Sequence, residues 1–166
     1  SFYHLVHSMM CNSAFRDAHP YGVDGRMLQV IGLRVINVKN LILYLYPRMF
    51  SVDTETILPL TGESFAHGTV FLFHTISKIY IWVSDQVDPN FLINAFGCQT
   101  LDQLPTTFPP NNPQYQPNPA SPEYQKLQNI IQGCWELSGM YLLVEVIGKG
   151  SPRESVFSEI IVDDAK

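Results

Sequence analysis

Charged residues and cysteines are both scarce in this sequence. Only 15% of the 166 residues are charged, and the three cysteines, Cys11, Cys98 and Cys134, form an odd set without the spacing of metal ligands. No Asn-x-Ser/Thr acceptor for N-glycosylation occurs. These absences disfavour a secreted, disulfide-rich domain and fit a reducing compartment.

Long hydrophobic runs and clusters of basic residues are also missing. The longest apolar run, Leu41 to Tyr46, is far shorter than the roughly 20 residues that a helix needs to cross a bilayer. The net charge is −5, and the ten lysines and arginines lie at least four residues apart along the chain, Lys39 and Arg48 among them. A groove for nucleic acid or a patch for acidic lipid would need such clusters. We therefore expect no nucleic-acid partner.

Apolar residues, in contrast, are plentiful. They make up 46% of the chain, and 166 residues are enough to bury a sizeable core. The length predicts one globular domain with an appendage. The chain begins within an amphipathic segment, Phe2 to Met10, and shows no signal peptide. These features suggest a piece of a longer protein.

The first 48 residues have the periodicity of helices. Apolar residues recur at helical spacing over Phe2 to Met10, and Asp24 is a cap for a second helix. A third segment, Val38 to Tyr46, is apolar nearly all round before a proline ends it. Because so short a unit cannot bury its own apolar faces, we predict that residues 1–48 are an α-helical unit covered either by chain upstream of it or by the domain that follows, residues 49–166.

The segment from Gly68 to Phe96 organises the second domain. Thr69 to Phe73 is almost wholly apolar and Ile79 to Val83 is β-branched or aromatic, so we predict two strands buried on both faces and joined by a hairpin loop. Asp88 followed by proline predicts a helix start, because the Asp side chain accepts a hydrogen bond from an open backbone N–H. We expect Leu92, Ile93 and Phe96 to form the apolar stripe of that helix and Gly97 to end it.

Shorter elements precede and follow this segment. Met49 to Val52 and Thr56 to Leu60 are typical of short strands. Pro105 to Pro122 has seven prolines in eighteen residues and predicts an extended, mobile surface loop. A serine-proline pair then begins a long helix that ends at Gly139, and Met140 to Ile147 predicts another buried strand. The fold class is therefore α/β, with four or five strands and two long helices.

The order of strand, hairpin, aromatic strand and helix start resembles the signature of gelsolin-like domains. A wider set of motifs is similar, in the same order, to one family, the cargo-selecting subunits of the inner COPII vesicle coat (Sec twenty-four). These motifs are Tyr46 to Asp53, Leu58 to Thr61, Phe71-Leu72, Trp82-Val83, Phe96-Gly97, and Ser121 with Asn129 to Ile131. Asp24 to Leu45 is similar to the end of that family's helical domain, and Phe157 to Asp164 to the segment after its gelsolin-like domain. The proline-rich loop departs from the family, which usually has a more acidic stretch there.

The resemblance implies a fold, a function and partners. It implies that residues 49–166 form a gelsolin-like domain, with a central mixed sheet flanked by helices, and that residues 1–48 are the C-terminal part of an α-helical domain. It implies that the chain is a non-enzymatic part of a coat subunit that selects cargo for transport from the endoplasmic reticulum to the Golgi. It also implies a cytoplasmic protein that associates peripherally with endoplasmic-reticulum exit sites and vesicles. Through the full-length protein, the implied partners are the sister subunit Sec twenty-three, cargo membrane proteins and the coat-recruiting small GTPase. Zinc is expected only in the missing N-terminal part, and no catalytic, cofactor-binding or metal residue is carried over to this fragment.

An actin-binding gelsolin-like module is the alternative function. Gelsolin-like domains that bind calcium have an acidic residue directly after the glycine that opens the central strand. Thr69 follows Gly68 here, and a hydroxyl does not replace a carboxylate for a hard cation. The helix expected from Asp88 to Phe96 is also short for an actin-facing helix. The coat function is therefore preferred.

Two motifs that could bind phosphate or metal are incomplete. The turn from Gly148 to Ser151 resembles half of a phosphate loop, but Leu143 stands where the first glycine is required. His4 and His7 lie three residues apart on the first expected helix, with no acidic residue within one turn. We expect a plain turn and solvated or core histidines.

Two further arrangements depend on the fold. His67 and His74 flank the central strand, and a histidine there could activate the thiol of Cys98 only if the fold brings these residues together. Arg153 would correspond, by analogy, to the arginine that a gelsolin-like domain of the sister subunit supplies to a small GTPase. Neither arrangement is supported by spacing, so we expect a scaffold for docking and no enzyme active site.

Overall fold

The structure is a computed structural model that describes Leu43 and residues 47–157. The chain divides into two compact units, Ser1–Pro47 and Arg48–Lys166. The helices predicted before residue 47, together with His4 and His7, lie outside the described residues except for Leu43. In the described part of the chain, no helix has both the length and the hydropathy needed to cross a bilayer.

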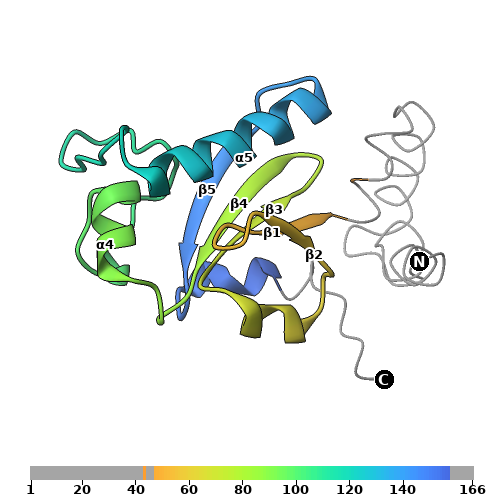
Figure 1. The fold of residues 1–166 in the computed structure, drawn as a ribbon, viewed down its shortest axis with the longest axis horizontal. Coiled ribbons are helices and arrows are strands. Elements are labelled where there is room, and N and C mark those ends of the chain that lie inside the picture. Colours follow the sequence, from red (N-terminus) through yellow and green to blue (C-terminus); the bar gives the residue numbers. More distant parts are fainter. Residues whose placement is uncertain (1–42, 44–46, 158–166) are drawn as a thin grey trace, which may run out of the picture. The chain divides into compact units, whose positions relative to one another are not determined.

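The described part of the second unit is built on one mixed sheet of five strands (Figure 1). In chain order the strands are β1 (Arg48–Ser51), β2 (Thr56–Leu58), β3 (Val70–His74), β4 (Lys78–Val83) and β5 (Leu143–Gly148). Their order across the sheet is β2-β1-β3-β4-β5. The pairs among β1 to β4 are antiparallel, whereas β4 and β5 are parallel. The predicted α/β fold class is confirmed.

The two central strands are the ones that the sequence marks most clearly. All five residues of β3 are buried, and the last three of β4 are buried as well. Leu72 lies opposite Ile81 in the antiparallel register. The hairpin turn is closed by Thr75, whose backbone N–H and hydroxyl both donate to the carbonyl of Lys78, at 3.0 and 2.8 Å. Burial on both faces explains why these strands lack the alternation of a half-exposed strand.

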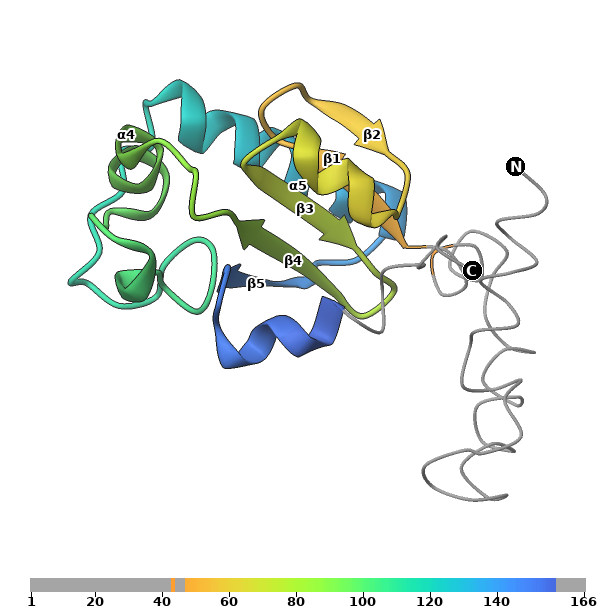
Figure 2. The same cartoon turned by 90° about the horizontal axis from the view of Figure 1, so that it is seen from below.

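Helices cover both faces of the sheet (Figures 1 and 2). The long helix α5 (Pro122–Ser138) crosses one face, and the 3₁₀ helices η1 (Gly62–His67) and η4 (Pro152–Val156) lie on the other. On the α5 face, Leu127 and Ile131 pack with Leu72 and Ile81 in the main core. Full burial of each such side chain contributes about 1.5–3 kcal/mol to folding. The face under η1 and η4 is instead dominated by aromatic rings.

The helix that follows β4 starts where it is expected, but its apolar face differs from the prediction. Asp88 Oδ1 accepts a hydrogen bond of 2.8 Å from Asn90 N, and the chain runs through α4 (Pro89–Phe91) into a π-helical turn, η2 (Leu92–Phe96). The prediction that Ile93 belongs to the buried stripe is wrong, because its side chain is 46% exposed and Ala95 is buried instead. A π turn bonds residue i to i+5, so it rotates residues out of the 3.6-residue register that the prediction assumes.

The long helix α5 is confirmed in place and in its two caps. Ser121 Oγ accepts from Tyr124 N at 3.2 Å, and Gly139 ends the helix in the left-handed conformation with φ +71°. The prediction of two long helices is wrong in the described part of the chain, because α4 and η2 together span eight residues, Pro89 to Phe96. Gly97, with φ +72°, ends that segment early.

Strand β5 begins three residues later than predicted. Met140 and Tyr141 are 51% and 87% exposed, and the strand starts at Leu143. The left-handed cap at the end of α5 is followed by a short turn, in which the Tyr141 ring packs edge-on against Trp135 at 5.0 Å. The apolar residues at the start of the predicted strand therefore belong to the turn.

The proline-rich loop is held against the domain at both ends. Phe108 N donates to Val144 O at 3.1 Å, and Val146 N donates to Thr106 O at 3.0 Å, so the loop pairs with the outer edge of β5. Farther along, Asn118 N donates to Asn94 O at 2.8 Å. The prediction of an extended surface loop omits this role, in which the loop covers an edge strand that would otherwise expose unpaired backbone groups.

Candidate functional site

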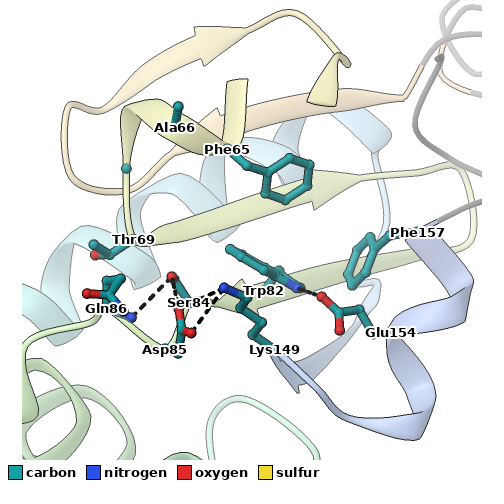
Figure 3. Close-up of a pocket in the computed structure, with 11 residues that line it drawn as sticks. Phe65, Ala66, Thr69, Trp82, Ser84, Asp85, Gln86, Lys149, Glu154 and Phe157 are labelled. Atoms are coloured by element: carbon teal, nitrogen blue, oxygen red, sulfur yellow. Dashed lines mark hydrogen bonds and ion pairs between the residues drawn. The ribbon is translucent and has the colours of Figure 1, made fainter. Parts of the chain in front are cut away.

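A hollow opens on the aromatic face of the sheet, between η1 and η4 (Figure 3). Its volume is about 760 Å³. The lining residues come from η1, the start of β3, the end of β4, the turn after β5, and η4. They are Phe65, Ala66, Gly68, Thr69, Trp82, Ser84, Asp85, Gln86, Lys149, Glu154 and Phe157. We call this feature the η1–η4 hollow.

The floor of the hollow is aromatic and held in place. The Trp82 ring packs edge-on against Phe65 at 4.9 Å and lies 5.8 Å from the Phe71 ring. Its indole Nε1–H donates a hydrogen bond of 2.9 Å to Glu154 Oε1 (Figure 3). The second carboxylate oxygen of Glu154 accepts from Gly150 N at 2.8 Å. Ring packing and hydrogen bonds therefore join the floor to η4 and fix the orientation of the indole.

One rim of the hollow is polar and electrically balanced. Lys149 Nζ lies 3.0 Å from both carboxylate oxygens of Asp85 (Figure 3). The hydrogen bond from Lys149 holds the pKa of Asp85 below its usual value, with smaller help from Ser84 and Gln86. Both partners of the ion pair are about half exposed, so the pair adds little stability. Its effect is to place a neutral, hydrogen-bonding edge beside an apolar floor.

The arrangement is suited to docking and contains no catalytic constellation. The lining has no cysteine or histidine beside a base, and its carboxylates are already bound to Lys149 or to backbone and indole N–H groups. Among residues 43 and 47–157, no group of three or more His, Cys, Asp or Glu could hold a metal ion. An aromatic floor with a polar rim is the composition of a protein interaction surface.

Arg153, the candidate arginine from the sequence, is engaged inside the domain. Its guanidinium forms a close ion pair with Glu145, a carboxylate of β5 whose side chain is 13% exposed. Lys78 Nζ contacts the other oxygen of Glu145 at 2.6 Å, and this hydrogen bond raises the pKa of Lys78. Glu145 thus joins β4, β5 and η4. An arginine committed in this way is not presented freely to a partner's phosphate groups.

Comparisons with known proteins agree with this fold. The sequence profile of the gelsolin repeat matches residues 51–123. Protein transport protein SEC24 of Yarrowia lipolytica (strain CLIB 122 / E 150) is 25% identical over 119 residues, which covers 61% of this chain and 13% of that protein. The crystal structure of the human COPII-coat protein Sec24c matches with a TM-score of 0.75 and 15% identity, over 97% of this chain and 21% of that one. Residues 48–157 therefore have a gelsolin-like fold and are similar to Sec24 proteins. The chain spans only a small part of the length of either relative.

Thr69, which follows the glycine before the central strand β3, belongs to an internal hydrogen-bond network with Asp53. Asp53 Oδ2 accepts from Thr69 N at 2.5 Å and from Val70 N at 3.4 Å, and the Thr69 hydroxyl donates to the same oxygen at 3.2 Å. A Cβ at Gly68 would lie 2.9 Å from that oxygen, which explains the glycine. The Asp53 carboxylate therefore fixes the start of β3 in this gelsolin-like domain.

The fold does not bring His67, His74 and Cys98 together as a site. His67 is exposed on η1, whereas His74 is buried at the end of β3, with Nε2 2.7 Å from Ser138 Oγ. Cys98 is buried after η2, and its thiol donates weakly to Leu92 O at 3.9 Å. Burial raises the pKa of Cys98 to about 11, so the nucleophilic thiolate is disfavoured.

Sequence reasoning missed the rim of the hollow, although one signal was available. Asp85 and Lys149 are 64 residues apart, and the latter lies in the turn that was compared with a phosphate loop. That turn is a plain one, with Gly150 at φ +79°. Since β4 and β5 are parallel, the residues that follow each strand meet at one edge of the sheet. Recognising a parallel pair would have placed these two side chains together.

Proposed function

We propose that this chain is the gelsolin-like part of a Sec24-type COPII coat subunit and acts as a structural and protein-interaction domain in transport from the endoplasmic reticulum to the Golgi. The observation that carries the proposal is the 25% identity to a protein transport protein over 119 residues. The gelsolin-like fold and the likeness to a COPII-coat protein support it.

A non-enzymatic role is supported by the chemistry of the η1–η4 hollow. Its floor is apolar and its charged groups are paired with each other, so it offers contact area without a reactive group. We propose that a side chain of a neighbouring coat component or of another domain of the parent protein occupies this hollow. The aromatic floor would anchor that side chain, because buried aromatic contacts contribute most to such interfaces.

Partners and location follow from the same proposal. The full-length protein would pair with the sister subunit Sec twenty-three, select cargo membrane proteins and be recruited by the small GTPase of the coat. It would lie in the cytoplasm and peripherally on endoplasmic-reticulum exit sites and vesicles. In this proposal the zinc site belongs to the N-terminal part of the parent protein, and this fragment carries no cofactor.

The test uses the full-length parent protein, because the chain spans a small part of its relatives. We would measure its flotation with liposomes in the presence of the sister subunit and the GTP-loaded small GTPase. The variant Ala66→Arg places a long side chain in the hollow from an exposed position. The matched control is Gln128→Arg, an exposed position on α5 across the sheet.

We expect the parent protein to float only when both coat components are present, and Ala66→Arg to weaken coat assembly more than Gln128→Arg. Failure of the parent protein to bind the sister subunit or the liposomes would refute the coat proposal. Equal behaviour of the two variants would refute only the role of the hollow. Calcium-dependent co-sedimentation of the 166-residue chain with actin filaments would instead support the actin-binding alternative.

A further inference from the structure

A second hollow lies on the α5 face of the sheet, between α5 and β1, and we call it the Arg48 groove. Its volume is about 410 Å³. Asn129, Gly133 and Leu137 are four residues apart and therefore follow one line along α5. Arg48 and Phe50 are two apart on β1 and point to the same side of the sheet. The remaining lining residues are Glu55, Ile130 and Cys134.

The floor of the groove is apolar. Phe50 and Ile130 are partly buried and pack against the main core, and Cys134 between α5 and the sheet is 3% exposed. The core packs against the inner side of these side chains, and their outer side forms the apolar floor of the groove. A groove of this size with such a floor can accept one or two aliphatic side chains.

The charges along the groove are uneven. Near Ile130, the carboxylate of Glu55 is 3.4 Å from Lys126 Nζ, so the charges there are balanced. The guanidinium of Arg48, in contrast, has no hydrogen-bond or ion-pair partner within the described ranges, although the residue is only partly exposed. The guanidinium lies close enough to Cys134 to affect its thiol. Burial raises the pKa of Cys134 to about 12, and the positive charge of Arg48 lowers that pKa by a smaller amount. One end of the groove therefore carries an uncompensated guanidinium, a group that favours a carboxylate with which it can form two hydrogen bonds.

Two exposed residues of α5 leave the helix surface accessible to an approaching chain. Gly133 lies in the interior of α5, where glycine is a poor helix former, and a Cβ built there meets nothing within 4 Å. Neither a positive φ nor crowding requires this glycine, but it leaves the helix backbone open to close approach. Asn129, one turn earlier, has a carboxamide with no hydrogen-bond partner among the described residues. A carboxamide offers both a donor and an acceptor, which is what a peptide group requires.

We propose that the Arg48 groove binds a short, extended peptide segment that carries an aliphatic side chain and a nearby carboxylate. The carboxylate pairs with the Arg48 guanidinium, and the aliphatic side chain lies on Phe50 and Ile130. Asn129 hydrogen-bonds to the peptide backbone, which passes over Gly133. One unpaired cation beside an apolar floor fits a peptide better than a lipid surface, because lipid surfaces are recognised by clusters of basic residues. The inference concerns a site separate from the η1–η4 hollow and does not depend on membership of a coat.

The experiment begins with a selection. Random heptapeptides displayed on phage are selected on the immobilised 166-residue chain, and the enriched sequences are synthesised for titration. We expect them to contain an acidic residue within a few positions of Leu, Ile or Val. We also expect Arg48→Gln to weaken their binding about tenfold or more, the usual effect of losing a charge-assisted hydrogen bond. Arg48→Lys should restore only part of the affinity, because an ammonium lacks the planar fork.

Gly133→Ala separates a binding role from a structural one. The added methyl group enters the groove, whereas the intrinsic preference of alanine favours the helix. We expect weaker peptide binding together with an unchanged or higher melting temperature, and Gln128→Ala, an exposed change on another line of α5, should leave the affinity unchanged. Amide chemical shifts of Asn129, Gly133 and Cys134 should move on titration.

Three results would each overturn the proposal. The first is a selection without enrichment over the bare support. The second is a set of peptides that lack a carboxylate or that bind Arg48→Gln as well as the unaltered chain. The third is displacement of the peptides by inorganic phosphate or by phosphatidylserine vesicles at equal charge concentration, which would make the groove a general anion site.

Discussion

The indole of Trp82 donates its N–H to the carboxylate of Glu154 at 2.9 Å, a hydrogen bond between residues 72 positions apart. Trp82 lies in the central strand β4 and is only 6% exposed, so its N–H has little access to water. Glu154 lies in η4 and also accepts from Gly150 N at 2.8 Å. This single carboxylate therefore satisfies a nearly buried donor and attaches η4 to the sheet.

The first prediction concerns that carboxylate. Glu154→Ala leaves the Trp82 N–H without its partner, which should lower the free energy of unfolding by about 1–3 kcal/mol. Urea denaturation followed by tryptophan fluorescence measures this change. Glu136→Ala is the control, because the side chain of that exposed residue of α5 accepts one hydrogen bond, from Gln132, among the described residues, and its effect should stay within about 0.5 kcal/mol. Equal effects of the two substitutions would show that the hydrogen bond does not hold η4.

The second prediction compares two glycines in the same left-handed conformation. Gly97 has φ +72° and Gly139 has φ +71°, and each ends a helical segment. A Cβ at Gly97 would lie 2.4 Å from the backbone N of Gln116, whereas a Cβ at Gly139 meets nothing within 4 Å. Gly139→Ala should therefore cost about 1 kcal/mol from backbone strain alone. Gly97→Ala should cost at least about 2 kcal/mol more, because backbone must move.

Urea unfolding of the two glycine variants gives the comparison directly. The difference between them removes the shared strain of the left-handed conformation and isolates the contact with the proline-rich loop. If both variants lose the same stability, the close approach of Gln116 to the helix end is not present in solution.

The third prediction concerns His74. Burial, and to a smaller degree the charge of Arg48, lowers the pKa of His74 from 6.5 to about 4, and its Nδ1 has no hydrogen-bond partner among the described residues. The folded state thus holds His74 neutral, while the unfolded state binds a proton below about pH 6.5. The contribution of His74 to the free energy of unfolding is therefore fully present above about pH 6.5 and decreases as the pH falls toward 4. Between about pH 7.5 and about pH 5.5 the loss should be about 1.4 kcal/mol.

His74→Gln tests this linkage, because glutamine can still hydrogen-bond to Ser138 but does not titrate. In His74→Gln, the difference in unfolding free energy between about pH 7.5 and about pH 5.5 should be about 1.4 kcal/mol smaller than in the unaltered chain. His67→Gln, at an exposed histidine of η1, should leave the difference unchanged. An unaltered pH dependence in His74→Gln would contradict the burial of a neutral ring.

The fourth prediction concerns Asp53 and calcium. The carboxylate accepts hydrogen bonds from the backbone of Thr69 and Val70, so Asp53→Ala should lower the free energy of unfolding by about 1–2 kcal/mol. Asp102→Ala, at an exposed residue of the 3₁₀ helix η3 (Leu101–Gln103), is the control and should change the free energy of unfolding by less than about 0.5 kcal/mol. Millimolar calcium should not raise the melting temperature of the unaltered chain. A rise that is lost in Asp53→Ala would instead assign this carboxylate to a calcium site.

Local chemistry accounts for the parts of the fold that the sequence predicted well. Asp88 and Ser121 cap helices because a short polar side chain next to proline satisfies an open N–H, and this rule needs no knowledge of distant residues. The same holds for Gly97 and Gly139, where the left-handed conformation favours glycine. The apolar composition of β3 and β4 likewise marked them as central strands before their neighbours were known.

Predictions based on the periodicity or the hydrophobicity of a segment were less successful. A 3.6-residue period predicts that Ile93 lies in the core, but the backbone forms a π turn there. The hydrophobicity of Met140 and Tyr141 predicts a strand, yet they lie in the turn between α5 and β5. In each case the competing packing of the chain around that position, which local composition does not describe, decided the outcome.

The sequence by itself determined the elements of this domain, since helix caps, glycine stops and doubly buried strands are set by interactions within a few residues. Only the tertiary structure decided that Asp85 meets Lys149, that Trp82 meets Glu154, and that Arg48 faces Gly133 across a groove. Those contacts depend on a parallel strand pair and on the side of the sheet that α5 covers. Such long-range choices are settled by burial of the whole core, so no short stretch of sequence contains them.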